Sequence, residues 1–338
     1  ALEPQLNNDV VGGLFAPTGG IIEPYRYVFA LVESAQKNGV DIKTQFTVVE
    51  GIHEKDCWTI KSKEGDTIKA RYVVNSSGLF ADEVSKNFGA ESFEIIPRKG
   101  EEFLLQRNAR GLPNHVIFPV PSAHTKGILV IPTVEGTLMI GPTAIETENK
   151  DDLETTAQNL EMVFSQATYM VPAISRREII TSFAGLRPTM KGDDFYIEPS
   201  KLQPNFIQVA GIQSPGLTAS PAIGEYVKDI LKHEGLRLVE KINFDPFLPH
   251  PIKVRDLSFE QLEQLVEKEP KYGHIVCRCE NVSEAEIIEA ISKEHTTLDG
   301  IKFYTRAGMG RCQGAFCTYK VLKIISREVG IPIEKITK

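Results

Sequence analysis

Four cysteines are gathered in one short stretch of the last third of the chain. Cys277 and Cys279 form a C-x-C pair, and Cys312 and Cys317 form a C-x4-C pair further on. Four thiolates gathered in this way repel one another unless they bind something, and a [2Fe-2S] cluster takes four cysteine sulfurs, two on each iron. We therefore expect an iron–sulfur site at these four residues.

Structural zinc and disulfides are the alternatives that this spacing leaves open. Zinc sites built from four cysteines generally use C-x2-4-C pairs rather than C-x-C, which favours iron. Secreted disulfide domains distribute their cysteines differently. The fifth cysteine, Cys57, lies in an alternating, strand-like stretch, and we expect it to be a reduced structural thiol.

The residues around the cysteines favour an anionic ligand set. Ser283 and Glu286 form an S-x-x-E capping box, which predicts a helix just after the first pair, and a second helix is expected from Thr318. The free amides and positive dipole ends of both helices would face the thiolates. Arg278, Arg306 and Arg311 are expected to add positive charge near the sulfurs. Gly308, Gly310 and Gly314 are expected to let the backbone approach the sulfurs closely.

Size and composition describe an ordinary globular chain of more than one domain. It has 338 residues, of which 41% are hydrophobic and 25% charged. The net charge of -7 argues against nucleic-acid partners. The longest apolar runs, such as 128–134, are far shorter than the ~20 residues of a membrane span, and no leader opens the chain. We expect no transmembrane segment and a cytoplasmic location.

The first part of the chain alternates helical and strand-like patterns. Helical spacing begins at Glu23, with Pro24 in the first turn and Gly39 just past the end. We expect this helix to feed a small meander. Its β-rich stretches are Ile42–Glu50, Trp58–Lys61 and Thr67–Asn75.

A second, largely antiparallel sheet is predicted over residues 98–141, where strand-rich segments are punctuated by prolines. Helices are predicted at Leu153–Ser165 and Pro215–Lys232, the second of them after a strand at Phe206–Ala210. Prolines between 243 and 251 break the pattern before a helix at Phe259–Glu267, so we place the domain boundary there. The predicted domains are 1–247 and 256–338.

The cysteine-containing segments 275–282 and 305–314 resemble the bacterioferritin-associated-ferredoxin-like (BFD-like) [2Fe-2S] domain. This domain is found at the C-terminus of the large subunit of anaerobic glycerol-3-phosphate dehydrogenase and of related flavoproteins. The resemblance covers roughly 256–338 and implies a [2Fe-2S] cluster on the four cysteines.

The first 245 residues or so resemble the D-amino-acid oxidase and glycerol-3-phosphate dehydrogenase superfamily of FAD-dependent enzymes. Its landmarks occur in order at Gly20–Pro24, Asn75–Ala81, Phe183–Pro188 and Gly211–Thr218. The resemblance implies a mixed α+β and α/β fold with an antiparallel substrate sheet. It implies FAD contacts at Val48, Ser77, Gly78, Gly211, Ile212, Gly216, Leu217 and Thr218.

Arg187 falls on the arginine of the family's G-x-R-P motif, which lies over the flavin and binds the anionic group of the substrate. A guanidinium grips a carboxylate or phosphate through two parallel hydrogen bonds and so orients the substrate. The alternative is a surface residue at a strand end.

Two departures from the family pattern bear on the cofactor and the substrate. No G-x-G-x-x-G follows a strand, so we expect the segment that grips the FAD diphosphate to be missing from this chain. Gln213 and Ser214 stand where many glycerol-3-phosphate dehydrogenases have Gly-Lys in the flavin loop. The identity of the small anionic substrate therefore stays open.

The resemblance implies a dehydrogenase that passes electrons from FAD through the [2Fe-2S] cluster to an acceptor protein or subunit. Glycerol 3-phosphate is the first expected substrate; a 2-hydroxy acid such as 2-hydroxyglutarate, or an amino or opine acid, comes next. A non-catalytic electron-transfer subunit and a zinc-stabilised binding module remain alternatives. The candidates for a general base and for further anion contacts are His115, His124, His250, Arg98 and Lys99.

Overall fold

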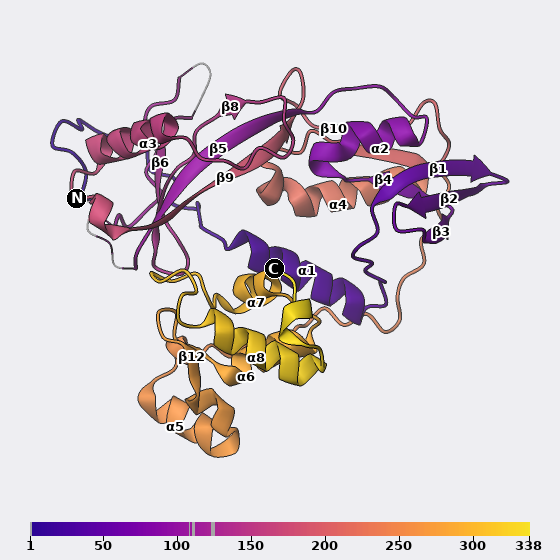
Figure 1. Cartoon of the computed structure of the whole chain (residues 1–338). Coiled ribbons are helices and arrows are strands. Elements are labelled where there is room, and N and C mark those ends of the chain that lie inside the picture. Colours follow the sequence, from indigo (N-terminus) through magenta and orange to yellow (C-terminus); the bar gives the residue numbers. More distant parts are fainter. Residues whose placement is uncertain (1, 108, 110–111, 123–125) are drawn as a thin grey trace.

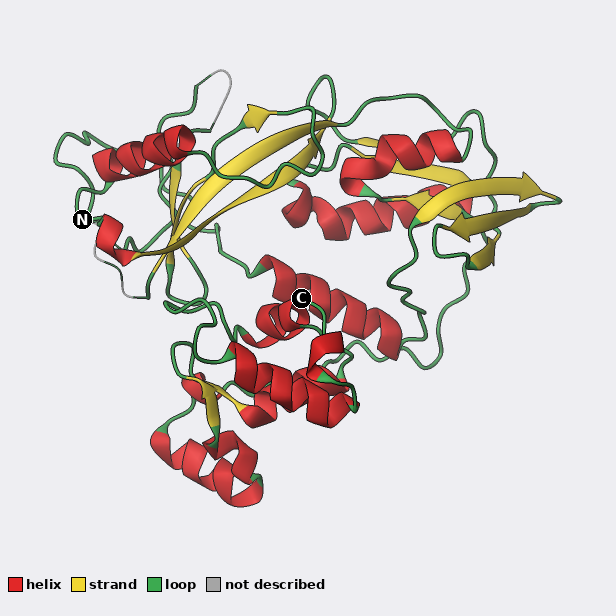
Figure 2. Ribbon diagram, in the orientation of Figure 1, coloured by secondary structure: helices red, strands yellow, loops and turns green. Residues whose placement is uncertain are grey.

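The computed structural model describes residues 2–107, 109, 112–122 and 126–338 (Figure 1). Sheets with flanking helices form the part before residue 234, and a small, mostly helical unit follows residue 254 (Figure 2). This combination of parallel and antiparallel strands with a helical C-terminal unit confirms the predicted fold class.

Helix α1 (Pro24–Lys37) begins with the predicted proline and is followed by Gly39 at φ +84°, a left-handed conformation that glycine adopts without strain. The helix lies against the C-terminal unit (Figure 1). Arg26 Nη1 donates to the carbonyl of Tyr304 at 2.7 Å, and the Phe29 ring packs against Tyr304 with centroids 6.0 Å apart.

The predicted meander is a three-stranded antiparallel sheet, but its first strand begins six residues later than the expected start at Ile42, and its last strand is shorter than expected. Its strands are β1 (Val48–Glu54), β2 (Cys57–Ser62) and β3 (Thr67–Ala70). The single strand expected over 67–75 is wrong, because the chain leaves the sheet at residues 71–72 and β4 (Val73–Asn75) joins a different sheet. Cys57 is a free thiol in β2, as expected.

Strand β4 pairs in parallel with β11 (Phe206–Ala210), and β10 (Tyr196–Pro199) completes that sheet on the other side of β11. Every residue of β11 is buried. Helices α2 (Ala81–Asn87) and α4 (Gly216–His233) follow β4 and β11, so each strand of the parallel pair leads through a short turn into a helix.

The predicted antiparallel sheet is built around β5 (Ile96–Leu105), which pairs along its whole length with β9 (Ile179–Thr189). Helix α3 (Ala157–Met170) covers one face of this sheet (Figure 1), where it buries Phe103 and Leu105. Residues alternate along a strand, so Arg98, Gly100 and Glu102 lie on the opposite face. The remaining strands are β6 (Leu129–Pro132), β7 (Leu138–Gly141) and β8 (Ile145–Glu146).

The C-terminal unit has its own apolar core, formed around Ile287, Ile301 and Ile325. Ser283 caps α6 through the predicted reciprocal box with Glu286. Its elements are α5 (Phe259–Lys268), β12 (Ile275–Cys277), β13 (Val282–Ser283), α6 (Glu284–Ser292), α7 (Leu298–Thr305) and α8 (Thr318–Val329). The described 3-10 helices are Gly78–Phe80, Arg176–Glu178, Val254–Asp256, Pro270–Gly273 and Ile333–Lys335.

Candidate active site and metal centre

The four cysteines predicted as ligands come together as two pairs that each join the two motifs. Cys279 Sγ lies 3.5 Å from Cys312 Sγ, and the Cys277 and Cys317 thiols share a hydrogen bond. Across the described ranges, no three His, Cys, Asp or Glu side chains are arranged to hold one metal ion. Two sulfur pairs fit a two-iron cluster, which takes two thiolates on each iron, better than they fit a single tetrahedral zinc ion.

Hydrogen bonds from backbone amides and from neighbouring thiols favour the thiolate form of Cys277 and Cys312. The hydrogen bond from Cys317, aided by the amides of Gly308 and Glu280, outweighs burial and lowers the pKa of Cys277 to about 6, while the same bond raises that of Cys317. The pKa of Cys312 is also lowered: burial opposes this, but the amides of Phe316 and Gly314 outweigh it. The donor set suits thiolate ligands.

The sequence predicts that the N-termini of two helices, α6 and α8, face the cysteine sulfurs, and only α8 starts at one of the cysteines. Cys317 is itself the N-cap residue of α8. The first amides of α6, however, are used elsewhere, because Glu284 N bonds the carbonyl of His274 at 2.9 Å and Glu286 N bonds Ser283 Oγ at 3.3 Å. The amides of Glu280 and of the loop 308–316, and not those of α6, therefore supply backbone donors to the sulfurs.

The parallel pair of β4 and β11 brings two predicted FAD loops to one edge of their sheet. Asn75 Nδ2 donates to Gln208 Oε1 at 2.9 Å across the pair, and the segments 76–78 and 211–216 leave the strands side by side. Gly78 and Gly211 have φ of +58° and +68°, so both turns use a conformation that favours glycine. The carboxyl ends of parallel strands are where α/β folds bind nucleotides.

The other predicted FAD residues lie on these loops or next to them. Gly216 is buried at the first position of α4, whereas Leu217 and Thr218 are exposed on its first turn. Ser77 is exposed, and its hydroxyl donates to Asn75 Oδ1 at 2.7 Å. Ile212 and Val48 are half-buried; Ile212 packs with β11, and Val48 packs at the start of β1 in the core around Trp58.

Arg187 lies on the face of the large sheet that α3 leaves open. It stands opposite Arg98 in the register of β5 and β9, and its Nη2 donates to the carbonyl of Thr143 at 2.7 Å. The guanidinium lies directly over Gly100: a Cβ built at residue 100 would lie 2.5 Å from Arg187 Nη2. Burial, and secondarily Arg98, lower the pKa of Arg187, while Glu102 opposes them.

Glu102 is a site residue that the sequence analysis missed. Its side chain lies on the same face as Arg187 and over Gly141, where a Cβ would lie 2.7 Å from Glu102 Cγ. No residue that the structure describes forms a hydrogen bond or ion pair with its carboxylate. Burial raises the pKa of Glu102 to about 7, with Arg187 opposing the rise. The available signal was the position of Glu102 four residues after Arg98, which strand alternation places on the same face.

Of the two basic residues suggested as anion contacts, only Arg98 lies on this face. Lys99 points to the α3 side, where Nζ bonds Asp152 Oδ2 at 2.7 Å. Arg98 reaches Asp193 Oδ1 at 3.0 Å, and Gln213 Nε2 reaches the same oxygen at 3.2 Å. Asp193 therefore connects the substrate sheet to the flavin loop.

A cation also reaches the position where the family pattern lacks its loop lysine. Lys126 Nζ donates to Ser214 Oγ at 3.3 Å. The positive charge that the Gln213–Ser214 sequence omits can thus come from the segment before β6. Lys126 was not singled out in the sequence because nothing local marks it as a neighbour of residue 214.

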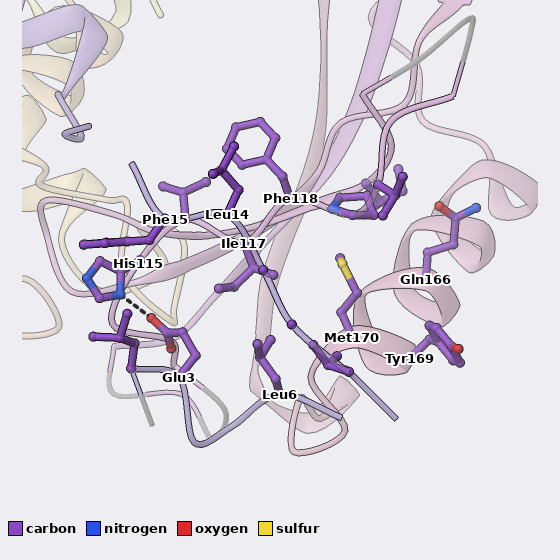
Figure 3. Close-up of a pocket in the computed structure, with 18 of the residues that line it drawn as sticks. Glu3, Leu6, Leu14, Phe15, His115, Ile117, Phe118, Gln166, Tyr169 and Met170 are labelled. Carbon is purple, nitrogen blue, oxygen red and sulfur yellow. Dashed lines mark hydrogen bonds and ion pairs between the residues drawn. The ribbon is translucent and has the colours of Figure 1, made fainter. Parts of the chain in front are cut away.

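The histidine candidates do not gather around Arg187. His115 bonds Glu3 at 2.5 Å and packs edge-on against Phe15 in an apolar pocket of about 900 Å³ beside α3, whose lining does not include Arg187 or Glu102 (Figure 3). His250 is exposed and bonds the carbonyl of Pro251 at 3.1 Å. His124 lies outside the described residues.

Comparisons with protein families identify both parts of the chain. Residues 1–230 match the family described as FAD dependent oxidoreductase, and residues 275–327 match the BFD-like [2Fe-2S] binding domain. The chain therefore belongs to the FAD-dependent oxidoreductase family and carries a BFD-like [2Fe-2S] domain. The expected cofactors, FAD and a [2Fe-2S] cluster, are confirmed at this level.

Among individual relatives, a glycerol 3-phosphate dehydrogenase from Caloramator mitchellensis is 41% identical over 100% of this chain and 70% of its own length. A glycerol 3-phosphate oxidase from Mycoplasma pneumoniae is 29% identical over 72% of this chain and 64% of its own. The solved dithionite-reduced L-α-glycerophosphate oxidase from M. pneumoniae with FAD bound has a TM-score of 0.59 at 29% identity, covering 63% of this chain and 56% of that one.

The chain thus spans about two thirds of the length of these curated relatives. Within the described ranges, no helix has the length and apolar character needed to cross a bilayer.

Proposed function

We propose that this chain is part of an FAD-dependent glycerol-3-phosphate dehydrogenase, made of an FAD and substrate domain at 1–247 and a [2Fe-2S] domain at 256–338. The observation that supports this best is that Arg187 and an unpartnered carboxylate, Glu102, lie on one open sheet face beside the flavin loops. The 41% identity with a glycerol 3-phosphate dehydrogenase supports the choice of substrate.

Arg187 binds the anionic group of the substrate in this proposal. Only its Nη2 is bonded among the described residues, so most of its N–H donors remain available for phosphate oxygens. Arg98, directly opposite, lies on the same face but is already paired with Glu146 and Asp193, so Arg187 is the guanidinium that is available to the substrate. An unpaired guanidinium suits a phosphate better than a neutral group, because the charge-assisted hydrogen bonds offset the cost of removing the phosphate from water.

Glu102 accepts the proton that the C2 hydroxyl of glycerol 3-phosphate loses as the alcohol becomes a ketone. When bound, FAD supplies the acceptor for the hydride that leaves C2 with its electron pair. A pKa of about 7 leaves a substantial fraction of Glu102 unprotonated at neutral pH and still gives it enough basicity to take a proton. The site residues named for FAD, and the four cysteines as cluster ligands, belong to this proposal.

The electrons leave one at a time through the [2Fe-2S] domain to an acceptor protein or subunit, in the cytoplasm. The exposed Cys279 and half-buried Cys312 form the side of the sulfur set nearest to solvent, which suits transfer to an external partner. Cys277 and Cys317 form the buried side.

The test is anaerobic titration of the flavin- and cluster-loaded enzyme with candidate substrates. Glycerol 3-phosphate should bleach the visible flavin absorption, and the reduced-cluster EPR signal should follow. Bleaching by 2-hydroxyglutarate instead would show that the enzyme is a 2-hydroxy-acid dehydrogenase. If no anionic alcohol or amino acid bleaches the flavin while dithionite still reduces the cluster, the chain is a non-catalytic electron-transfer subunit.

A further inference from the structure

A buried set of charged residues joins the cluster loop to the substrate sheet. Two carboxylates, those of Glu135 and Glu280, lie among cationic side chains drawn from three separate parts of the chain. We call this set the ionic junction, and its members are Arg107, Glu135, Lys253, Arg255, Glu280 and Arg306.

Glu280 directly follows the ligand Cys279 and is held by arginines from both domains. Its Oε2 lies 2.8 Å from Nε of Arg306, which ends α7, and 2.5 Å from Nη2 of Arg107, which follows β5. Arg255, in the 3-10 helix Val254–Asp256 before α5, lies 3.6 Å from the same oxygen. The Glu280 side chain is only 2% exposed.

Glu135, on the turn between β6 and β7, is the second buried centre of the junction. Its carboxylate lies 3.1 Å from Lys253 Nζ, 3.7 Å from Arg107 Nη2 and 3.8 Å from Arg306 Nε, and it also pairs with Arg255. Arg107 Nη1 donates to the backbone carbonyl of Glu135 at 2.6 Å. Arg107 therefore contacts both carboxylates at once.

The junction also touches the loop that carries the second cysteine pair. A Cβ at Gly310 would lie 2.4 Å from Cys279 Cβ and 3.1 Å from Glu280 Oε1, so this loop packs directly against the side chains of the adjacent residues Cys279 and Glu280. Arg311 Nη1, beside Cys312, donates to Gln106 Oε1 of the sheet domain at 2.9 Å. Residues flanking a cysteine of each pair are thus fixed to the end of β5.

Stability alone is a weak reason to bury so many charges here. The free-energy cost of removing paired ions from water is often as large as the electrostatic attraction between them, and apolar residues of similar size would pack as well. Glu23 lies 3.6 Å from Arg306 and Asp256 lies 3.5 Å from Arg255, so the four cations are balanced by four carboxylates and the effect on the cluster depends on which charges lie nearest to the sulfurs. A thiolate-ligated cluster is anionic and becomes more so on reduction, so nearby positive charge favours the reduced form, while the Glu280 carboxylate opposes it.

We propose that the ionic junction sets the reduction potential of the [2Fe-2S] cluster, with Glu280 and Arg107 as opposing positioning residues. Arg107 belongs to the sheet domain and acts on the cluster from across the domain boundary. The reduction potential of the cluster therefore also depends on the contact between the cluster domain and the sheet. Strand β5 carries Arg98 and Glu102 on the substrate face and ends at Leu105, about 10 Å from Glu102 at the strand rise per residue, and Arg107 follows two residues later. One strand therefore positions both the substrate groups and the cluster's electrostatic environment.

The test is an EPR-monitored redox titration of the cluster-loaded protein with dithionite and mediators, for Glu280→Gln and Arg107→Gln. Both changes leave a neutral, polar glutamine side chain, and they remove charges of opposite sign. The midpoint potential should rise in Glu280→Gln and fall in Arg107→Gln. Arg176→Gln, which removes an exposed arginine paired with Glu161, is the matched control and should leave the potential unchanged.

Shifts of both variants in the same direction would indicate loosened packing and greater solvent access, and they would overturn the proposal, as would unchanged potentials. If Glu280→Gln does not retain its cluster, Glu135→Gln removes the same charge away from the ligand loop and should also raise the potential. Failure of Glu135→Gln to do so would likewise overturn it. The titration uses no substrate, so its result is independent of the glycerol 3-phosphate assignment.

Discussion

Arg98 and Arg187 stand directly opposite one another on the antiparallel strands β5 and β9 and share the face of the sheet that α3 does not cover. Arg98 is paired with Glu146 at 3.1 Å and with Asp193 at 3.0 Å. Arg187 has no carboxylate within ion-pair distance among the described residues. A half-buried guanidinium without an acidic partner, beside a second one, marks the place where an external anion is expected.

Replacing Arg187 by lysine should lower kcat/KM for glycerol 3-phosphate by roughly 100-fold, or about 3 kcal/mol, since lysine keeps the charge but loses the planar pair of donors. Steady-state kinetics over a range of substrate concentrations measures this. Arg176→Lys, an exposed arginine on the same molecule, should behave as the unchanged enzyme. Equal kinetics for Arg187→Lys and the control would show that Arg187 does not bind the substrate.

The pH dependence of catalysis should report Glu102. A general base works only when it is unprotonated, so kcat/KM should rise with pH and level off above a pKa of about 7. Glu102→Gln cannot accept a proton and should lose roughly 100-fold or more in kcat, with a smaller change in substrate affinity. A Glu102→Gln enzyme that keeps both its rate and the rise near pH 7 would exclude Glu102 as the base.

The same residue should make the protein less stable at high pH. Burial raises the pKa of Glu102 from 4.5 to about 7, so the folded state favours the protonated carboxyl more than the unfolded state does. The stabilisation is complete below about pH 4.5 and is lost as pH rises through about 7. At pH 8, Glu102→Gln should therefore be more stable than the parent by up to about 3 kcal/mol, with little difference at pH 4.5.

Urea unfolding of the two proteins at pH 8 and pH 4.5 measures this difference. Glu161→Gln, an exposed carboxylate of α3, is the control and should change stability little at either pH. A parent protein that is as stable as Glu102→Gln at pH 8 would mean that the carboxylate is better solvated than its position on the sheet indicates.

Local sequence signals predicted the secondary structure around the four cysteines well. The cysteine spacing, the Ser283–Glu286 box and the helix from Thr318 all depend on residues close together in the chain, and the structure has each of them. The strand Phe206–Ala210 was also predicted with its observed bounds, because a short apolar run between turn residues is a local pattern.

Long-range partners could not be predicted in the same way. Strand β4 was assigned to the meander because its neighbour along the chain is β3, whereas its hydrogen-bonded partner is β11, more than a hundred residues later. Lys99 was paired with Arg98 as an anion contact, although strand alternation sends adjacent residues to opposite faces. The ionic junction could not be predicted because its members come from separate parts of the chain: the segment after β5, the turn between β6 and β7, the segment 253–255, the residue after Cys279 and the C-cap of α7.

The close approach of Arg187 to Gly100 gives the sharpest test of the substrate site. Gly100 and Gly185 face each other across β5 and β9, and neither has a positive φ. A methyl group at residue 100 would lie 2.5 Å from Arg187 Nη2 and 2.8 Å from Pro142 Cβ, whereas one at residue 185 would meet nothing within 4 Å. Gly100→Ala should displace the guanidinium and lower kcat/KM roughly 10-fold or more, because small misplacements of positioning groups are costly. Gly185→Ala, the same change on the partner strand, should be nearly silent, and equal effects of the two alanines would mean that the position of Arg187 over Gly100 does not matter for substrate binding.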